Sequence, residues 1–311
     1  MLDAALVLPI VVGLFGACVG SFLNVVIYRL PRKDPDRGGL SVAKPARSFC
    51  PNCKRQIPWH ENVPILSWVL LGGKCKGCKS EISVRYLLVE ALTAFLFAWW
   101  TVLFLERAAE PAADWPLLAT GLLLTAVAIA VTFIDIDWRE IPDEITLPGT
   151  ALGVIASAAL PIVQRPSWLY EKLAGARGWE THLAALTSSA AGAIVGSGLL
   201  LLVAIAGKAV FRPKDAETGE PTDAMGLGDV KFMAMVGAFL GADGVLLVFF
   251  LGCVAGAIAG IAWLLIKRDR YIPFGPYLSL GVLLVTFFRT PIVRFLLEDW
   301  PRLVQGLFIR G

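Results

Sequence analysis

The sequence predicts an all-α integral membrane protein that crosses the bilayer about eight times and has one large cytoplasmic loop. Of the 311 residues, 57% are hydrophobic and only 17% are charged, whereas a soluble domain has roughly a quarter of its residues charged. The charged residues are crowded between long apolar runs, because charge is costly in hydrocarbon and cheap in loops. This distribution excludes an ordinary soluble globular domain.

Eight apolar runs are candidate spans, since a transmembrane helix needs about 20 mostly apolar residues. The sixth run is short and is separated from the seventh by residues 241–244, so these two runs could form one kinked hairpin, and seven spans are the alternative. The first run begins near Asp3 without a basic region or an A-x-A cleavage site, so we expect a retained span and not a signal peptide. The runs cover residues 5–28, 86–105, 116–135, 145–164, 187–210, 230–241, 243–266 and 273–288.

The distribution of lysine and arginine predicts the orientation. The interval 29–85 holds twelve basic and four acidic residues, so the positive-inside rule places it in the cytoplasm. The loops 136–144, 211–229 and 267–272 then also face the cytoplasm. The basic residues of 165–186 and of the tail fit this rule less well. We therefore expect a first span (1–28), a cytoplasmic loop domain (29–85), a membrane core (86–290) and an amphipathic tail (291–311) on the outer surface.

Four cysteines in the cytoplasmic loop form two C-x-x-C pairs, Cys50 with Cys53 and Cys75 with Cys78. Four thiolates in two such pairs can close tetrahedrally on a zinc ion, although the 21 residues between the pairs slightly exceed the usual spacing of about 15–20. Disulfides are disfavoured in a reducing cytoplasm, and a redox motif would not need two matched pairs. We predict a structural zinc site that helps this loop to fold.

Two clusters of carboxylates lie at the ends of predicted spans. Residues 135–143 (DIDWREIPD) follow the third span, and residues 226–231 (GLGDVK) begin the sixth. The predicted topology brings both clusters to the cytoplasmic face. Two converging carboxylates cannot both ionise cheaply, so they share a proton, as in aspartic proteases. Gly226 and Gly228 lack side chains, so a substrate backbone could approach Asp229 closely.

Simpler roles exist for each acid. Asp143 and Asp229 could cap helices, and Asp137 could be merely solvated. Asp135 could be an interfacial charge paired with Arg139 or Lys231. The proteolytic hypothesis depends on Asp135 and Asp229 meeting each other.

Taken together, these segments resemble the prepilin leader peptidase family, also called type IV leader peptidases. The ordered matches are residues 20–31 (GSFLNVVIYRLP), the loop with its two cysteine pairs and 61–68 (ENVPILSW), residues 82–90 (ISVRYLLVE), the two aspartate clusters, and 272–276 (IPFGP). The cysteine pairs and GxGDVK are the most specific of these matches.

The resemblance implies a GxGD-type aspartyl peptidase of the bacterial inner membrane. Such an enzyme cuts the basic leader from prepilins or pseudopilins after a glycine, at the cytoplasmic membrane face, and many members then N-methylate the new terminus with S-adenosylmethionine. By position, Asp135 and Asp229 carry over as the catalytic pair, with Gly226, Gly228, Lys231 and Asp143 as supporting residues. The zinc loop is typical of the bifunctional members. No residue is assigned to the methyl donor, since no G-x-G-x-x-G motif follows a predicted strand.

Two other functions are weighed against the peptidase: an ion-coupled transporter with a structural zinc loop, and a non-enzymatic assembly factor. A transporter usually places its carboxylates near mid-bilayer, often in repeated halves, whereas here they lie at one face and the sequence has no visible repeat. The expected partners are prepilin substrates and the lipid bilayer, with no nucleic acid.

Overall fold

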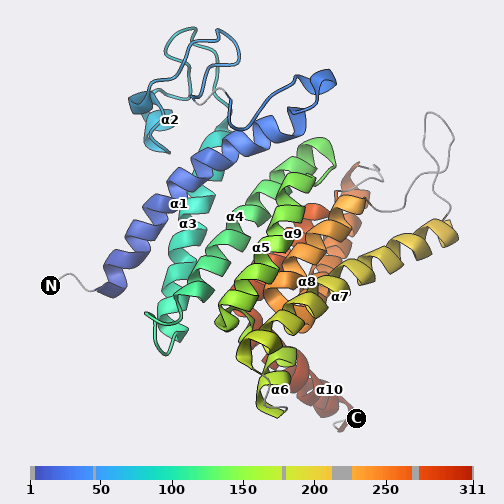
Figure 1. Ribbon diagram of the computed structural model, residues 1–311. Coiled ribbons are helices and arrows are strands. Elements are labelled where there is room, and N and C mark those ends of the chain that lie inside the picture. Colours follow the sequence, from blue (N-terminus) through green and yellow to red (C-terminus); the bar gives the residue numbers. More distant parts are fainter. Residues whose placement is uncertain (1–3, 45–46, 177–179, 212–225, 268–272, 310–311) are drawn as a thin grey trace.

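The computed structural model describes residues 4–44, 47–176, 180–211, 226–267 and 273–309, and these residues form an all-helical protein (Figure 1). No strand is present in these ranges, where the only β pairing is two isolated bridges. The prediction of an all-α fold is confirmed. The helices are α1 (Ala4–Arg29), α2 (Leu66–Leu70), α3 (Val84–Arg107), α4 (Trp115–Trp138), α5 (Asp143–Ala159), α6 (Trp168–Ala176), α7 (Thr181–Phe211), α8 (Leu227–Lys267), α9 (Gly275–Arg294) and α10 (Trp300–Ile309).

Six of the described helices are long and apolar enough to cross a membrane: α1, α3, α4, α7, α8 and α9. The fourth predicted span corresponds to α5, whose 17 residues reach about 25 Å, somewhat less than the hydrocarbon core of about 30 Å. The sixth and seventh predicted spans both lie within α8. The protein is thus a multi-pass membrane protein, and the number eight stays a prediction.

Helix α8 is broken at Gly241, which has the left-handed backbone angle φ 73°. An unbroken helix of its 41 residues would be about 60 Å long, twice the thickness of the hydrocarbon core. Instead, the chain folds back. Met233 and Val245, on either side of the break, approach the same residue of α7, Gly196. The predicted kinked hairpin is therefore present, and its turn begins at Gly241.

Helices α7 and α8 pack through glycines spaced four residues apart. A Cβ atom on Gly192 would lie 2.1 Å from the carbonyl oxygen of Gly237, and one on Gly196 would lie 2.3 Å from that of Met233. Small residues at this spacing let the backbones of membrane helices approach closely. This contact places the first half of α8 in the protein interior, where Phe232, Met233 and Val236 are fully buried.

The break in α8 frees carbonyl groups that polar side chains then satisfy. The amide of Gln164 donates to the carbonyl of Ala238 (2.8 Å), and Ser189 donates to the same oxygen (2.7 Å). Arg289 donates to the carbonyl of Leu240 (3.2 Å) and forms an ion pair with Asp243. Since an unpaired carbonyl is costly in a membrane interior, this network stabilises the kink.

The C-terminal region continues beyond the last predicted span. Helix α9 is kinked at Phe288 (φ −131°, ψ 22°), the residue where the predicted span ends, and helical structure then continues to Arg294. A π-helical turn (Phe295–Asp299) then leads directly into α10. Both α6 and α10 lie at the end of the molecule opposite the loop that carries α2 (Figure 1). Most of the loops 211–229 and 267–272, predicted to face the cytoplasm, lie outside the described residues.

Candidate active site and metal centre

The two aspartate clusters meet because the start of α8 packs on the connection between α4 and α5. A Cβ on Gly228 would lie 3.0 Å from the Cβ and 3.1 Å from the backbone nitrogen of Ile141. Only glycine fits this contact without a shift. The sequence suggested that the missing side chain at Gly228 admits a substrate, but in the structure Ile141 of the chain itself fills that space.

Asp135 occupies a buried position in the last turn of α4, where 6% of the residue is exposed. Its Oδ2 accepts the backbone N–H of Gly275 at the start of α9 (2.8 Å). A Cβ on Gly275 would lie 2.7 Å from that oxygen, so the contact requires glycine. The role of Gly275 was missed from the sequence, although it belongs to the segment IPFGP, a proline-flanked turn before an apolar run. Ile272 of that segment lies outside the described residues.

Asp229 is half-buried in the first turn of α8. It lies close enough to Asp135 for the two carboxyl groups to interact electrostatically. Gly226 has open space next to it. The nearest atom to a Cβ added at Gly226 would be Oδ2 of Asp229, 3.7 Å away. The two carboxyl groups, 94 residues apart in the sequence, thus share one end of the helical bundle.

The neighbouring acids have partners of their own. Both carboxylate oxygens of Asp143 accept from Lys231 at 2.7 Å, and Asp143 is the first helical residue of α5, not its cap. Asp137 is held by Arg85 at 2.6 Å and is not simply solvated. The predicted helix-capping role of Asp143 is therefore wrong, and Lys231 is engaged by Asp143 instead of Asp135.

The zinc loop consists of two knuckles with matching backbone hydrogen bonds, 25 residues apart. In the first, the N–H of Cys50 donates to the carbonyl of Arg55, and in the second, the N–H of Cys75 donates to that of Ser80, both at 2.9 Å. Lys54 and Lys79, which follow the second cysteine of each pair, both have left-handed backbones (φ 59° and 60°). No repeat was expected from the sequence, so this local repeat is a finding of the structure.

The four cysteine Sγ atoms lie within 4.8 Å of one another. Those of Cys50 and Cys78 are 3.8 Å apart, which matches the edge of about 3.8 Å for a tetrahedron with Zn–S bonds of about 2.3 Å. The hydroxyl of Ser80 lies 3.1 Å from Sγ of Cys78, and hydrogen bonds from Ser80 lower the pKa of Cys78 to about 6. A thiolate at neutral pH is the form that binds zinc, so Cys78 is prepared for a metal. The close spacing of all four sulfur atoms is what makes the predicted zinc ligands fit a metal site.

Ion pairs attach the loop to the end of the bundle that carries the aspartates. Arg37 donates to both carboxylate oxygens of Glu140 (2.8 and 2.7 Å), and Lys33 pairs with Glu144. Within the loop, Arg55 donates to both carboxylate oxygens of Glu61 (2.8 and 3.0 Å) and thereby lowers the pKa of Glu61. The metal centre and the carboxylate pair therefore lie at the same end of the protein.

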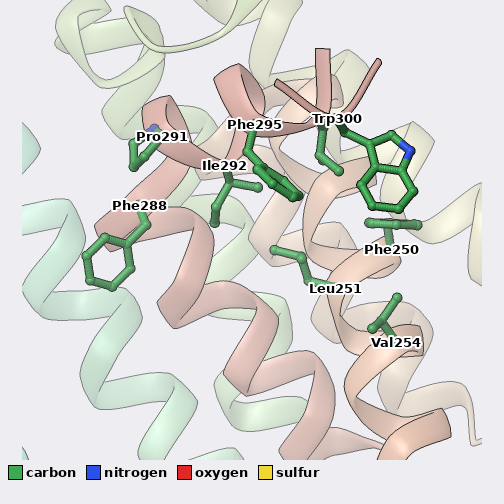
Figure 2. A pocket seen from close by; sticks show the side chains of 9 residues that line it. Phe250, Leu251, Val254, Phe288, Pro291, Ile292, Phe295 and Trp300 are labelled. Carbon is green, nitrogen blue, oxygen red and sulfur yellow. The ribbon is translucent and has the colours of Figure 1, made fainter. Parts of the chain in front are cut away.

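A recess of about 750 Å³ lies between α8 and the end of α9. Figure 2 shows the apolar side chains that line it, among them Phe250 of α8 and Phe295 and Trp300 of the C-terminal segment. These walls belong to the part of α9 far from Gly275, the residue that contacts Asp135. The recess offers no group for acid–base chemistry, and an apolar surface on a membrane helix is expected to face lipid.

Two family models match the sequence. Residues 14–104 match the Bacterial Peptidase A24 N-terminal domain. This range includes the second half of α1, the zinc loop and most of α3. Residues 122–261 match the Type IV leader peptidase family, which includes both aspartates. The two matches together cover more than half of the chain.

Curated relatives are similar over nearly their whole length. Proteins named prepilin leader peptidase/N-methyltransferase from Aeromonas hydrophila and Neisseria gonorrhoeae are both 34% identical to this chain. The match to the Aeromonas protein covers 92% of this chain and 93% of that protein. The match to the Neisseria protein covers 90% of this chain and 92% of that protein. The protein of the same name from Legionella pneumophila is 30% identical over 94% of this chain and 95% of its own. No solved structure matches.

Proposed function

Because this chain belongs to the type IV leader peptidase family, we propose that it is a GxGD-type aspartyl endopeptidase that removes the basic leader from prepilins or pseudopilins. The catalytic pair is Asp135 and Asp229, and the cut follows a glycine at the cytoplasmic membrane face. The observation that supports this proposal is the meeting of these two carboxyl groups at the end of α4 and the start of α8.

The site suits the hydrolysis of a peptide bond at a membrane surface. One carboxyl group draws a proton from water while the other, protonated, donates to the peptide carbonyl. A substrate with a basic leader and an apolar helix keeps its charges in the cytoplasm, so its scissile bond lies at the interface, where water is available. The exposed acids Glu81, Asp34 and Asp36 are the proposed partners for the leader. Glu61, the fourth acid of the loop, is already paired with Arg55 and Lys76.

The supporting residues have two different roles, which follow from where they lie around the catalytic pair. The ion pair of Lys231 with Asp143 joins the second turn of α8 to the first residue of α5, beside the catalytic pair. Gly226 leaves space next to Asp229, so it is the glycine that admits the substrate backbone. The location at helix ends also favours the peptidase over an ion-coupled transporter, whose carboxylates would lie near the midplane.

The proposal includes N-methylation of the new N-terminus with S-adenosylmethionine, because the relatives are named as N-methyltransferases. The orientation follows from the basic loop 29–85, which the positive-inside rule places in the cytoplasm of a bacterial inner-membrane protein. The zinc ion has a structural role, since four cysteine ligands leave no open position for water.

Cleavage of a prepilin by the purified protein in detergent tests the peptidase. Asp135→Asn and Asp229→Asn should each abolish cleavage while the zinc content and the melting temperature stay unchanged, and Asp299→Asn, at the opposite end of the molecule, should cleave normally. Wild-type rates in either active-site variant would exclude this catalytic pair. Mass spectrometry of the product reports the cut site and the methyl group together.

A further inference from the structure

A second cavity, of about 490 Å³, lies between α1, α3 and the zinc loop. Its volume is within the range of about 300–1,000 Å³ typical of small-molecule sites. Its walls combine aromatic side chains with many polar and charged ones. The aromatic residues are Tyr28, Phe49, Trp68 and Tyr86, the acids are Glu61, Glu81, Glu90 and Asp137, and the bases are Arg29, Arg32, Arg55, Lys76 and Arg85. Each base is already engaged within the protein, three of them in ion pairs with Glu61 or Asp137 and the other two with backbone carbonyls. The peptidase chemistry of Asp135 and Asp229 does not use this cavity.

The cavity contains a buried carboxylate that has no cationic partner. Glu90, two turns into α3, is 8% exposed. It accepts the backbone N–H of Ile65 (2.7 Å) and a hydrogen bond from Ser21, but it forms no ion pair with any described residue. The other buried acid of the wall, Glu61, is paired with Arg55 and Lys76. Because an unpaired buried carboxylate is costly, Glu90 favours a ligand that carries positive charge.

The aromatic walls also suit a ligand in which the positive charge is attached to a nucleoside, because such a ligand has a flat base as well as a cationic centre. Flat aromatic rings stack on a purine base, and they attract a cation at their faces. Arg29 is buried against Phe49, with 5.7 Å between its guanidinium carbon and the ring centre. The amide of Asn24, also buried, donates to the carbonyl of Tyr86 (3.1 Å), which holds the α1 wall against the α3 wall.

One wall of the cavity is formed by a residue that is close in the sequence to the catalytic Asp135. Asp137, which is two residues after Asp135, lines the cavity and pairs there with Arg85. A new N-terminus released at Asp135 would therefore have a short path to Glu90. The zinc knuckles supply part of the opposite wall through Cys50 and Cys75, so the metal stabilises the shape of the cavity.

We propose that this cavity binds the sulfonium methyl donor, and that Glu90 is the carboxylate that faces the cationic reactants and accepts the proton of the N-terminal amine. This inference rests on the proposed N-methyltransferase activity. The bound donor supplies the methyl group: the amine nitrogen bonds to the methyl carbon, the carbon–sulfur bond breaks, and a neutral thioether leaves. The proton that the ammonium group releases before the transfer passes to Glu90 and then to water.

A basic leader peptide is another cationic ligand, but it fits the cavity less well. A leader has several dispersed charges on flexible side chains, whereas Glu90 is one buried charge among aromatic rings. The compact walls favour a single cation joined to a flat ring system.

Calorimetric binding of S-adenosylmethionine and of its neutral thioether product, S-adenosylhomocysteine, to the full-length protein in nanodiscs tests the proposal. Glu90→Gln should weaken S-adenosylmethionine binding by about tenfold, the value of one charged contact, and the thioether less. Val25→Trp, which fills the cavity from α1, should abolish binding of both. Glu106→Gln, the same change at the exposed far end of α3, should bind as the wild type does, and all three variants should retain zinc and prepilin cleavage.

The outcomes separate this inference from the proposed function. A preparation that cleaves prepilin but binds no donor overturns this inference and leaves the peptidase proposal intact. Donor binding that is unchanged in both Glu90→Gln and Val25→Trp has the same consequence. A basic leader peptide that binds in place of the donor and depends on Glu90 also overturns it. A preparation that cleaves no prepilin contradicts the peptidase, while the response of donor binding to Glu90→Gln still decides the role of the cavity.

Discussion

The backbone N–H of Gly275 donates to Oδ2 of Asp135 across 2.8 Å, and this contact joins the last turn of α4 to the first turn of α9. It orients one carboxyl group of the proposed catalytic pair and leaves its other oxygen for water or for Asp229. The start of α9 is therefore part of the candidate active site.

Gly275→Ala should lower prepilin cleavage by about a hundredfold, the effect of displacing a catalytic group by about 1 Å. The added Cβ would lie 2.7 Å from Oδ2 of Asp135, so that carboxyl group must move. Gly175→Ala is the matched control, because a Cβ there meets no atom within 4 Å. Rates of cleavage at equal zinc content provide the measurement, and a rate equal to that of the control would exclude this positioning role.

The ion pair between Lys231 and Asp143 is expected to affect catalysis more than stability. Both side chains are more than a third exposed, so the pair contributes only about 0.2–1 kcal/mol to the free energy of unfolding. We expect Lys231→Ala and Asp143→Ala each to slow cleavage several-fold with little change in melting temperature. The double variant should be no slower than either single one, because both changes remove the same contact. Additive losses would show that the two residues act separately.

Zinc should be lost on acidification, at a pH that depends on Ser80. The pKa of Cys78 is lowered to about 6 in the folded protein, below its value of about 8.5 in an unfolded chain. This thiolate therefore contributes stability at neutral pH, and the contribution falls away as the pH drops through about 6. Ser80→Ala removes the main cause of the lowered pKa, so zinc release should begin at a higher pH.

Release of zinc into a chromogenic chelator during stepwise acidification measures this shift. Ser41→Ala, in the same loop but away from the knuckles, should release zinc at the wild-type pH. Metal analysis should find about one zinc per chain, and none after the double change Cys50→Ser and Cys53→Ser. Equal release profiles for Ser80→Ala and the wild type would contradict the role of Ser80.

Gln164→Leu should destabilise the break in α8. The amide of Gln164 donates to the carbonyls of Ala238 and Phe239 (2.8 and 3.3 Å), and a buried carbonyl without a donor costs about 1–3 kcal/mol. Ser189 still donates to Ala238, so we expect the lower part of that range, measured as a lower melting temperature in detergent. Gln56→Leu, an exposed position, should melt as the wild type does.

The sequence was sufficient for features that depend on local composition. Charge distribution and apolar runs predicted the long spans within a few residues, and the basic interval 29–85 coincides with the loop between α1 and α3. The cysteine spacing predicted the metal cluster, because two C-x-x-C pairs leave few other arrangements. The expectation that Asp135 and Asp229 share one face of the membrane agrees with their proximity in the structure, since helix ends must alternate between the two sides.

The contacts between distant helices could be determined only by the tertiary structure. Lipid and protein interior are both apolar, so residues such as those of α4 and α8 are hydrophobic on every side, and their pattern does not reveal which face meets which neighbour. For this reason the sequence could not show that Gly275 contacts Asp135, that Ile141 fills the space at Gly228, or that Glu90 lines a cavity under the zinc loop. Those relationships depend on the rotation and depth of each helix, which the packing of the whole bundle decides.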